Sequence, residues 1–162
     1  MDIDALAPHF ERRFGDRGAL RELFAQVILY SGLITLSDHY APYGELAGAV
    51  LKMLAVIRGI RIGDDDLHAL KEPMATMPPH PDVHGALVKL REAGFRLFTL
   101  TNSPRATCAR QPEGAGITGR FEGQFSVDDG VHGYKPAREV YRAVQVSLGV
   151  VPSNLCLIAC QT

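Results

Sequence analysis

The sequence predicts an α/β protein in which a helical first half precedes a mainly parallel, doubly wound sheet. Two observations support this fold class. Up to residue 78 the apolar residues recur at helical spacing, and from residue 79 helical stretches alternate with short apolar runs. Such alternation is typical of a parallel sheet covered by helices on both faces. The pattern changes at the proline-rich segment 77–81, which cannot continue a helix. We therefore predict a helical domain over residues 1–78 and an α/β domain over residues 79–162.

Three helices are expected after residue 16. The first covers about residues 17–36, and the second covers residues 43–57, where Gly59 suits the end of a helix. The third begins at the run Asp64-Asp65-Asp66, because aspartates cap a helix N-terminus and interact favourably with its dipole. We interpret these carboxylates as a solvated helix start rather than a calcium site.

In the second half we expect helices over residues 82–93, from residue 104, and over residues 137–148. The strands between them are predicted at about residues 96–100, 124–127 and 155–158. The last run, Leu155-Cys156-Leu157-Ile158-Ala159, has no polar face, as expected of an interior parallel strand. Since the sequence ends at Thr162, that strand lacks a following helix, and we expect an incomplete sheet domain.

The composition excludes several classes of function. A formal net charge of -1 gives no electrostatic reason to expect nucleic acid or an acidic membrane as partner. No apolar run approaches the length of a membrane span, and the start Met1-Asp2-Ile3-Asp4 differs from a signal peptide. The three cysteines, Cys108, Cys156 and Cys160, have no metal-type spacing. We therefore expect a cytoplasmic location.

The junction Thr101-Asn102 is the best candidate for a binding site. An apolar run stops there, and Pro104 suits the first turn of a helix, so a hydroxyl and an amide lie at the carboxyl end of a strand. Open α/β sheets bind ligands at that edge. Lys135, on a turn between Gly133 and Pro136, adds a positive charge. Together these residues predict a site for a small anion.

Simpler interpretations stay open beside this one. Thr101 and Asn102 also suit a helix cap, and Lys135 alone is more often a solvated surface residue. His80 and His84 have the spacing of a metal pair, but the sequence offers no third ligand, so no metal is expected.

Three segments, Leu100–Pro104, Arg120–Asp128 and Tyr134–Tyr141, resemble the haloacid dehalogenase superfamily in order and spacing. They are most similar to the type II 2-haloacid dehalogenases. Residues 1–78 are similar in size and position to the helical cap domain of those enzymes. The resemblance therefore implies a cap and a Rossmann-like core that is incomplete here.

The resemblance also implies a reaction. In the family, an aspartate on the first core strand attacks the carbon bearing the halogen, and water hydrolyses the resulting ester to a 2-hydroxy acid. By resemblance, Lys135 and Thr101 are catalytic, and Asn102, Tyr141 and Leu29 bind substrate. Tyr141 also fits core packing, because it lies at helical spacing from apolar neighbours. No cofactor is implied, except magnesium if the chain follows the phosphatase branch. The expected partner is a small anionic substrate, and a homodimer is left open.

The sequence departs from the family pattern at the nucleophile. The early aspartates Asp2, Asp4 and Asp16 end no apolar strand, and the late acidic motif would begin beyond Thr162, so the chain looks truncated at both ends. Ala25 stands where the cap usually supplies an arginine. Family serine and asparagine positions read Ala159, Cys160 and Gln161. A dehalogenase, a magnesium-dependent phosphatase and an inactive fragment or binding module therefore stay open. We expect this polypeptide to be inactive on its own.

Overall fold

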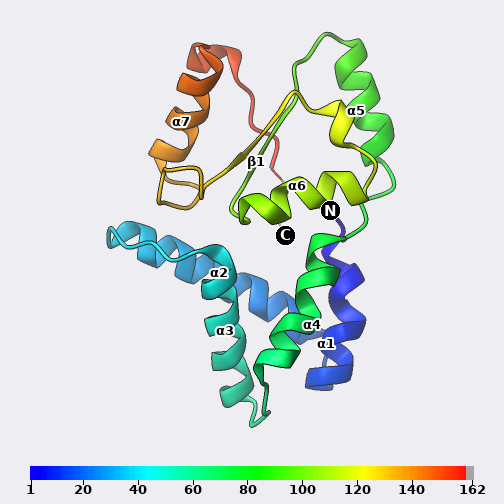
Figure 1. Ribbon diagram of the computed structural model, residues 1–162, viewed down its shortest axis with the longest axis vertical. Helices are drawn as coiled ribbons and strands as arrows, with labels where there is room; N and C mark the ends of the chain where they lie inside the picture. Colours follow the sequence, from blue (N-terminus) through cyan, green and yellow to red (C-terminus); the bar gives the residue numbers. More distant parts are fainter. Residues whose placement is uncertain (160–162) are drawn as a thin grey trace.

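The computed structural model describes residues 1–159, in which a group of helices adjoins a smaller α/β arrangement (Figure 1). Helices α1 to α4 gather in the lower part of the view, and the strands lie above them with α5, α6 and α7. The α-helices are α1 (Ala7–Phe14), α2 (Gly18–Leu36), α3 (Tyr43–Ile57), α4 (Asp64–Ala75), α5 (Val83–Glu92), α6 (Arg105–Gly114) and α7 (Arg138–Leu148). The strands are β1 (Phe98–Thr101) and β2 (Gly123–Ser126), and short 3-10 turns are η1 (Ile3–Leu6), η2 (Thr118–Arg120) and η3 (Pro152–Asn154).

One apolar core holds the first three helices together. Its buried members are Leu6, Ala7, Phe10, Ala19, Leu20, Leu23, Val27, Val50, Leu51 and Leu54. On α2 and α3 these residues follow the i, i+3, i+4 pattern of one helix face, so each helix buries one face. Gly59 follows α3 with a left-handed φ of +66°, which suits glycine. The predicted helices over residues 17–36 and 43–57 are thus confirmed.

The start of α4 also follows the prediction. The carboxylate of Asp66 accepts a hydrogen bond from the Gly63 N–H at 2.8 Å, so it caps the first turn from within the helix. Asp64 pairs with Lys52 at 3.1 Å on the surface. These acidic residues therefore act in helix capping and surface pairing.

A parallel two-stranded sheet forms the centre of the second half, within the described residues. Leu100 pairs with Phe125, and Thr101 pairs with Ser126 at the carboxyl end. The strands begin and end within about two residues of their predicted bounds. Helix α6 packs on β2 and connects the two strands (Figure 1). This βαβ connection places the carboxyl ends of β1 and β2 side by side.

The third predicted strand, residues 155–158, was wrong. Residues 155–159 have no strand structure, and Leu157 and Ile158 are 54% and 79% exposed. A strand forms by pairing with a neighbour, and within residues 1–159 neither β1 nor β2 pairs with this segment. Cys160 and Gln161, which we compared with family positions, lie outside the described residues.

Helix α2 corrects a second expectation. With 19 residues and a mean hydropathy of 1.3, it is long and apolar enough by length and composition to cross a membrane. The sequence interpretation that no run approaches such a length was therefore wrong. Five residues of α2 are buried within the fold (Ala19, Leu20, Leu23, Val27, Ser31), and 28% of its apolar window is buried, so a single helix of this kind is weak evidence for a membrane span.

Candidate functional site

The candidate site lies where β1 ends. The Thr101 hydroxyl oxygen accepts a hydrogen bond from the Ser103 N–H at 3.0 Å, which fixes the turn after the strand. Pro104 then precedes the first residue of α6, as the sequence predicts. Ser126, opposite Thr101 on β2, donates its hydroxyl hydrogen to the Ser103 carbonyl at 2.8 Å. Both strand ends therefore hold this turn in place.

Lys135 reaches this turn from the loop that follows β2. Its backbone N–H donates to the Asn102 side-chain oxygen at 3.1 Å, and its Nζ donates to the Leu100 carbonyl at 2.8 Å. The structure thus brings Asn102 and Lys135 into direct contact, immediately beside Thr101. Lys135 thus lies beside Thr101 and Asn102 in the fold, although it follows Asn102 by 33 residues in the sequence.

The directions of the β1 carbonyls show at which edge of the sheet the Lys135 ammonium group lies. The Thr101 carbonyl accepts from the Val127 N–H at 3.1 Å and so points toward β2. Successive carbonyls of a strand alternate in direction, so the Leu100 carbonyl points away from β2. Lys135 Nζ, bonded to that carbonyl, therefore lies on the edge of β1 that β2 leaves open.

Burial makes this lysine electrostatically unusual. Desolvation lowers the pKa of Lys135 from its ordinary value, because burial disfavours the charged form. Within residues 1–159, Lys135 forms no ion pair with a carboxylate. A partly buried cation without a carboxylate partner is well suited to receive an anion.

Several hydrogen-bond donors of the site are left unused by the described residues. Thr101 and Asn102 use their side-chain oxygens as acceptors, and no hydrogen bond among the described residues engages the Thr101 hydroxyl hydrogen or the Asn102 amide hydrogens. Lys135 has three ammonium hydrogens and uses one on Leu100. The arrangement thus offers several donors to an anion at a strand end, where such ligands bind in α/β folds.

Tyr141 and Leu29 are less closely tied to this cluster. Tyr141 is partly buried on α7, and no hydrogen bond of the described residues joins it to Lys135. Leu29 lies on α2 and is 53% exposed. Their assignment to substrate binding stays a prediction.

Sequence reasoning missed the importance of Tyr134. This side chain is fully buried, its N–H donates to Thr35 Oγ1 at 3.1 Å, and its hydroxyl donates to the Ala41 carbonyl at 2.6 Å. Burial raises the Tyr134 pKa, with the nearby Asp128 carboxylate as a further cause. The adjacent Tyr40 hydroxyl donates to Asp128, and its pKa is raised by burial first and by that carboxylate second.

Carboxylates near the strand ends are occupied by other partners. Asp129, after β2, accepts from the Ser126 N–H at 3.0 Å and pairs with Arg105 at 2.6 Å. Among the early aspartates, Asp2 accepts from the Asp4 N–H at 3.0 Å and Asp16 pairs with Arg58 at 2.9 Å. No group of three His, Cys, Asp or Glu side chains suited to a metal ion occurs within residues 1–159.

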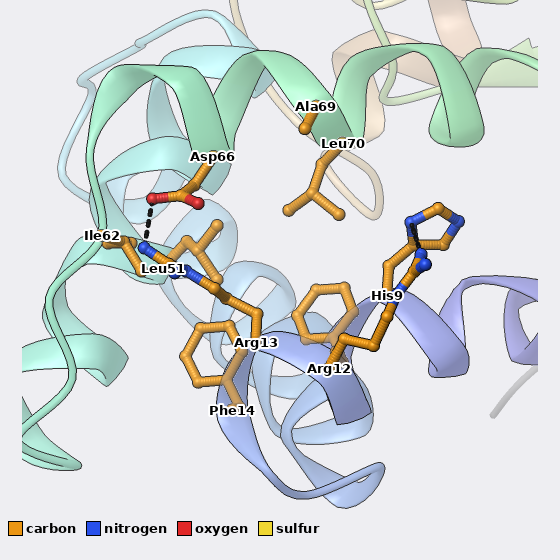
Figure 2. A pocket seen from close by; sticks show the side chains of 10 residues that line it. His9, Arg12, Arg13, Phe14, Leu51, Ile62, Asp66, Ala69 and Leu70 are labelled. Carbon is orange, nitrogen blue, oxygen red and sulfur yellow. Dashed lines mark hydrogen bonds and ion pairs between the residues drawn. The ribbon is translucent and has the colours of Figure 1, made fainter.

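Two of the cavities within residues 1–159 differ in their relation to Lys135. One, of about 230 Å³, is lined by residues of the sheet and α7, among them Leu100, Ser126 and Val140. The other, of about 180 Å³, lies between α1 and α4, where Arg13 pairs with Asp66 at 2.6 Å and Arg12 bonds His9 at 3.2 Å (Figure 2). Only the first includes a residue that contacts Lys135.

Comparison with known proteins agrees with the resemblance, although no family model matches the chain. It is 25% identical over 160 residues to haloacetate dehalogenase H-2 of Moraxella sp. (strain B), covering 98% of this chain and 71% of that protein. It is 27% identical over 130 residues to (S)-2-haloacid dehalogenase 1 of Pseudomonas sp. (strain CBS-3), covering 80% of this chain and 57% of that protein.

Solved structures show the same fold. The L-2-haloacid dehalogenase RSc1362 superposes with a TM-score of 0.87 at 26% identity and covers 94% of this chain and 70% of its own. The L-2-haloacid dehalogenase of Xanthobacter autotrophicus superposes with a TM-score of 0.85 at 24% identity, and this chain spans 62% of its length. By sequence and fold together, the chain is a homologue of the 2-haloacid dehalogenases of the haloacid dehalogenase superfamily.

Proposed function

We propose that Thr101, Asn102 and Lys135 form the anion-binding part of a hydrolase site for small 2-haloacids. The observation that supports this most is the position of Lys135 Nζ on the open edge of β1, bonded to the Leu100 carbonyl at 2.8 Å. A strand that pairs with that edge in parallel brings its carboxyl end beside the ammonium group. An aspartate ending such a strand is held ionised by Lys135 and can attack the substrate carbon.

The free donors account for substrate binding in this proposal. The Thr101 hydroxyl hydrogen and the Asn102 amide hydrogens bind the substrate carboxylate or the departing halide. Each hydrogen bond to a charged group contributes roughly 1.5–3 kcal/mol. Two such bonds total roughly 3–6 kcal/mol, and a dissociation constant of 1 mM requires about 4 kcal/mol, so with the loss of ligand freedom the binding is millimolar at best.

We further propose that the attacking carboxylate is not among these 162 residues. Asp2 and Asp16 are engaged in the contacts described above, and Asp4 pairs with Arg21 at 3.6 Å. The carboxylates after β2 bind Tyr40, Arg105 and the Ser126 N–H. Without a covalent nucleophile the rate falls by several powers of ten, so the polypeptide alone is a binding module.

The proposed function is tested by stereoselective binding. L-2-chloropropionate should bind the polypeptide in the millimolar range and more tightly than the D-enantiomer, and Lys135→Met should remove the preference. Chloride release, followed with a chloride electrode, should stay at the buffer rate. Sustained release that Lys135→Ala abolishes would show that the nucleophile lies within the chain. Equal binding of both enantiomers would contradict a 2-haloacid site.

The phosphatase alternative predicts a different ligand. In that case inorganic phosphate binds at Thr101 and Lys135 in a magnesium-dependent manner, and 2-chloropropionate does not compete with it.

We also propose that residues 1–78 act as a cap over the site, since helices α1 to α4 gather beside the strand-bearing half (Figure 1). We propose as well that the protein is cytoplasmic, and that its partner is a small anionic substrate and not a nucleic acid.

A further inference from the structure

A buried joint connects the end of α2 with the loop that holds Lys135. Tyr134 lies at its centre with 0% of its surface exposed, and it packs against Tyr40 and Tyr43 at ring-centroid distances of 5.4 and 6.2 Å. Its hydroxyl donates to the Ala41 carbonyl at 2.6 Å, in the connection between α2 and α3. The joint therefore links the helical half to the residue that precedes Lys135.

Thr35 is the fixed end of this joint. Its hydroxyl donates to the Ser31 carbonyl at 2.8 Å, and the same oxygen accepts the Tyr134 N–H at 3.1 Å. Because the donated bond fixes the rotamer, the acceptor lone pair is presented in one direction. Ser31, one turn earlier on α2, is itself 2% exposed, so this anchor belongs to the packed interior.

The backbone conformation gives independent support. Among the described residues, the non-glycine positions with positive φ are Asp38, at 55°, and His132, at 52°. Asp38 lies in the connection after α2, and His132 lies in the loop before Lys135. Uncommon backbone angles persist where the surrounding contacts hold the conformation firmly. One of these two residues lies on each side of the joint.

The consecutive residues Tyr134 and Lys135 are held from opposite directions. The Tyr134 N–H is bound by Thr35 of the helical half, and the Lys135 N–H is bound by Asn102 at the end of β1. The Lys135 side chain then ends on the Leu100 carbonyl. With both peptide groups held, the backbone of Lys135 has a defined position from which its side chain reaches the Leu100 carbonyl.

We propose that Thr35 and Tyr134 are positioning residues that hold the Lys135 ammonium at the open edge of β1. They contact neither substrate nor reacting atoms, and they act through the backbone of Lys135. The functional consequence rests on the proposed anion site, whereas the positioning itself concerns the ligand-free protein. The helical half thus sets the geometry of the site as well as covering it.

The experiment measures the Lys135 side chain without ligand. Protein labelled with ¹³C-lysine is titrated with base, and the Cε resonances of Lys52, Lys71, Lys89 and Lys135 are followed by NMR. In the wild type Lys135 should lose its proton below the ordinary lysine pKa of 10.5, because burial disfavours the charged form. In Thr35→Val and Tyr134→Phe the loosened ammonium reaches water, so its titration should move up toward that ordinary value. Thr35→Ser keeps the hydroxyl and should titrate like the wild type.

Matched controls separate positioning from general stability. The Thr76 hydroxyl also donates to a carbonyl four residues earlier, that of Glu72 at 2.8 Å, so Thr76→Val removes the same kind of bond far from Lys135. Tyr30→Phe removes a hydroxyl that contacts only the Met53 sulfur among the described residues, at 3.6 Å. Both controls should leave the Lys135 titration unchanged.

Each outcome decides the proposal. It is overturned if Thr35→Val and Tyr134→Phe leave the Lys135 titration unchanged, or if the controls shift it equally. It is also overturned if Thr35→Ser behaves like Thr35→Val, since the hydroxyl is then not responsible. If Thr35→Val does not fold, Tyr134→Phe and Thr35→Ser still give the answer.

A second readout separates this proposal from the proposed function. Affinity for L-2-chloropropionate should fall about 3- to 10-fold in Thr35→Val, as expected for one lost positioning hydrogen bond, and stay unchanged in Thr35→Ser. If the wild type binds no 2-chloropropionate, the proposed function fails while the lysine titration still tests the positioning. If the wild type binds and Thr35→Val binds equally well, the positioning proposal fails alone.

Discussion

Lys135 Nζ donates to the Leu100 carbonyl at 2.8 Å, on the side of β1 that faces away from β2. A lysine side chain therefore occupies the strand edge at which a neighbouring strand pairs. Its partial burial lowers its pKa, and no carboxylate within residues 1–159 forms an ion pair with it. The predictions below follow from this relationship and from the helical framework around it.

Replacing Lys135 by methionine should weaken binding of L-2-chloropropionate at least tenfold. The substitution keeps the apolar stem and removes the charge, and a hydrogen bond to a charged group contributes roughly 1.5–3 kcal/mol. Isothermal calorimetry or an NMR titration measures the effect. Lys52→Met, which removes an exposed lysine paired with Asp64, should bind like the wild type. Equal affinity in both variants would remove Lys135 from the site.

Stability should fall at high pH through Tyr43. Burial raises the pKa of Tyr43 to about 12, above its ordinary value of 10.0, so the folded chain keeps a phenol proton that the unfolded chain loses. Its contribution is complete below pH 10 and is lost as the pH rises toward 12, by about 2–3 kcal/mol. Urea unfolding between pH 9 and pH 12 should show a steeper loss for the wild type than for Tyr43→Phe. Parallel curves would contradict the burial of this hydroxyl.

Two glycines should respond to alanine with opposite signs. Gly32 lies inside α2 and Gly59 follows α3 with a φ of +66°, and an added Cβ meets no atom within 4 Å at either position. Gly32→Ala should stabilise the fold by about 0.5–1 kcal/mol, since alanine favours helix. Gly59→Ala should destabilise it by about 1–2 kcal/mol, since alanine disfavours the left-handed conformation. Urea midpoints that shift in the same direction would contradict the assigned backbone.

The outer face of α2 should promote self-association. Leu29, Leu33 and Leu36 lie on one helix face and are 53%, 49% and 85% exposed. Sedimentation velocity should detect association that Leu33→Gln and Leu36→Gln together reduce. Val146→Gln, at an exposed apolar position on α7, serves as the control. A wild type that sediments as a monomer at all concentrations would leave the homodimer without support.

The sequence predicted the helices and the central strands because their apolar periodicity is local. Asp64 marks the start of α4, and Thr101 ends β1, where a hydroxyl follows an apolar run. The segment 155–158 looked like a strand because it is apolar, but strand formation requires a neighbour that residues 1–159 do not provide. The sequence shows no uninterrupted apolar run as long as a membrane span, whereas helix α2 passes that test by length and mean hydropathy.

The sequence could predict that Thr101, Asn102 and Lys135 lie together because each stands next to a turn signal. It could not identify Thr35 and Tyr134 as partners. Tyr134 meets Thr35 and Ala41 across 99 and 93 residues, and Tyr40 meets Asp128 across 88. Such contacts depend on the packing of α2 against the second half, and no local pattern of residues encodes them.

Chemical-shift mapping tests the central claim most directly. In ¹H–¹⁵N spectra of the wild type, L-2-chloropropionate should cause saturable shifts of the Thr101, Asn102, Ser103 and Lys135 amides, and Lys135→Met should abolish them. No saturable shift at these residues, or shifts confined to the cavity around His9 and Arg12, would show that the carboxyl end of β1 does not bind the anion.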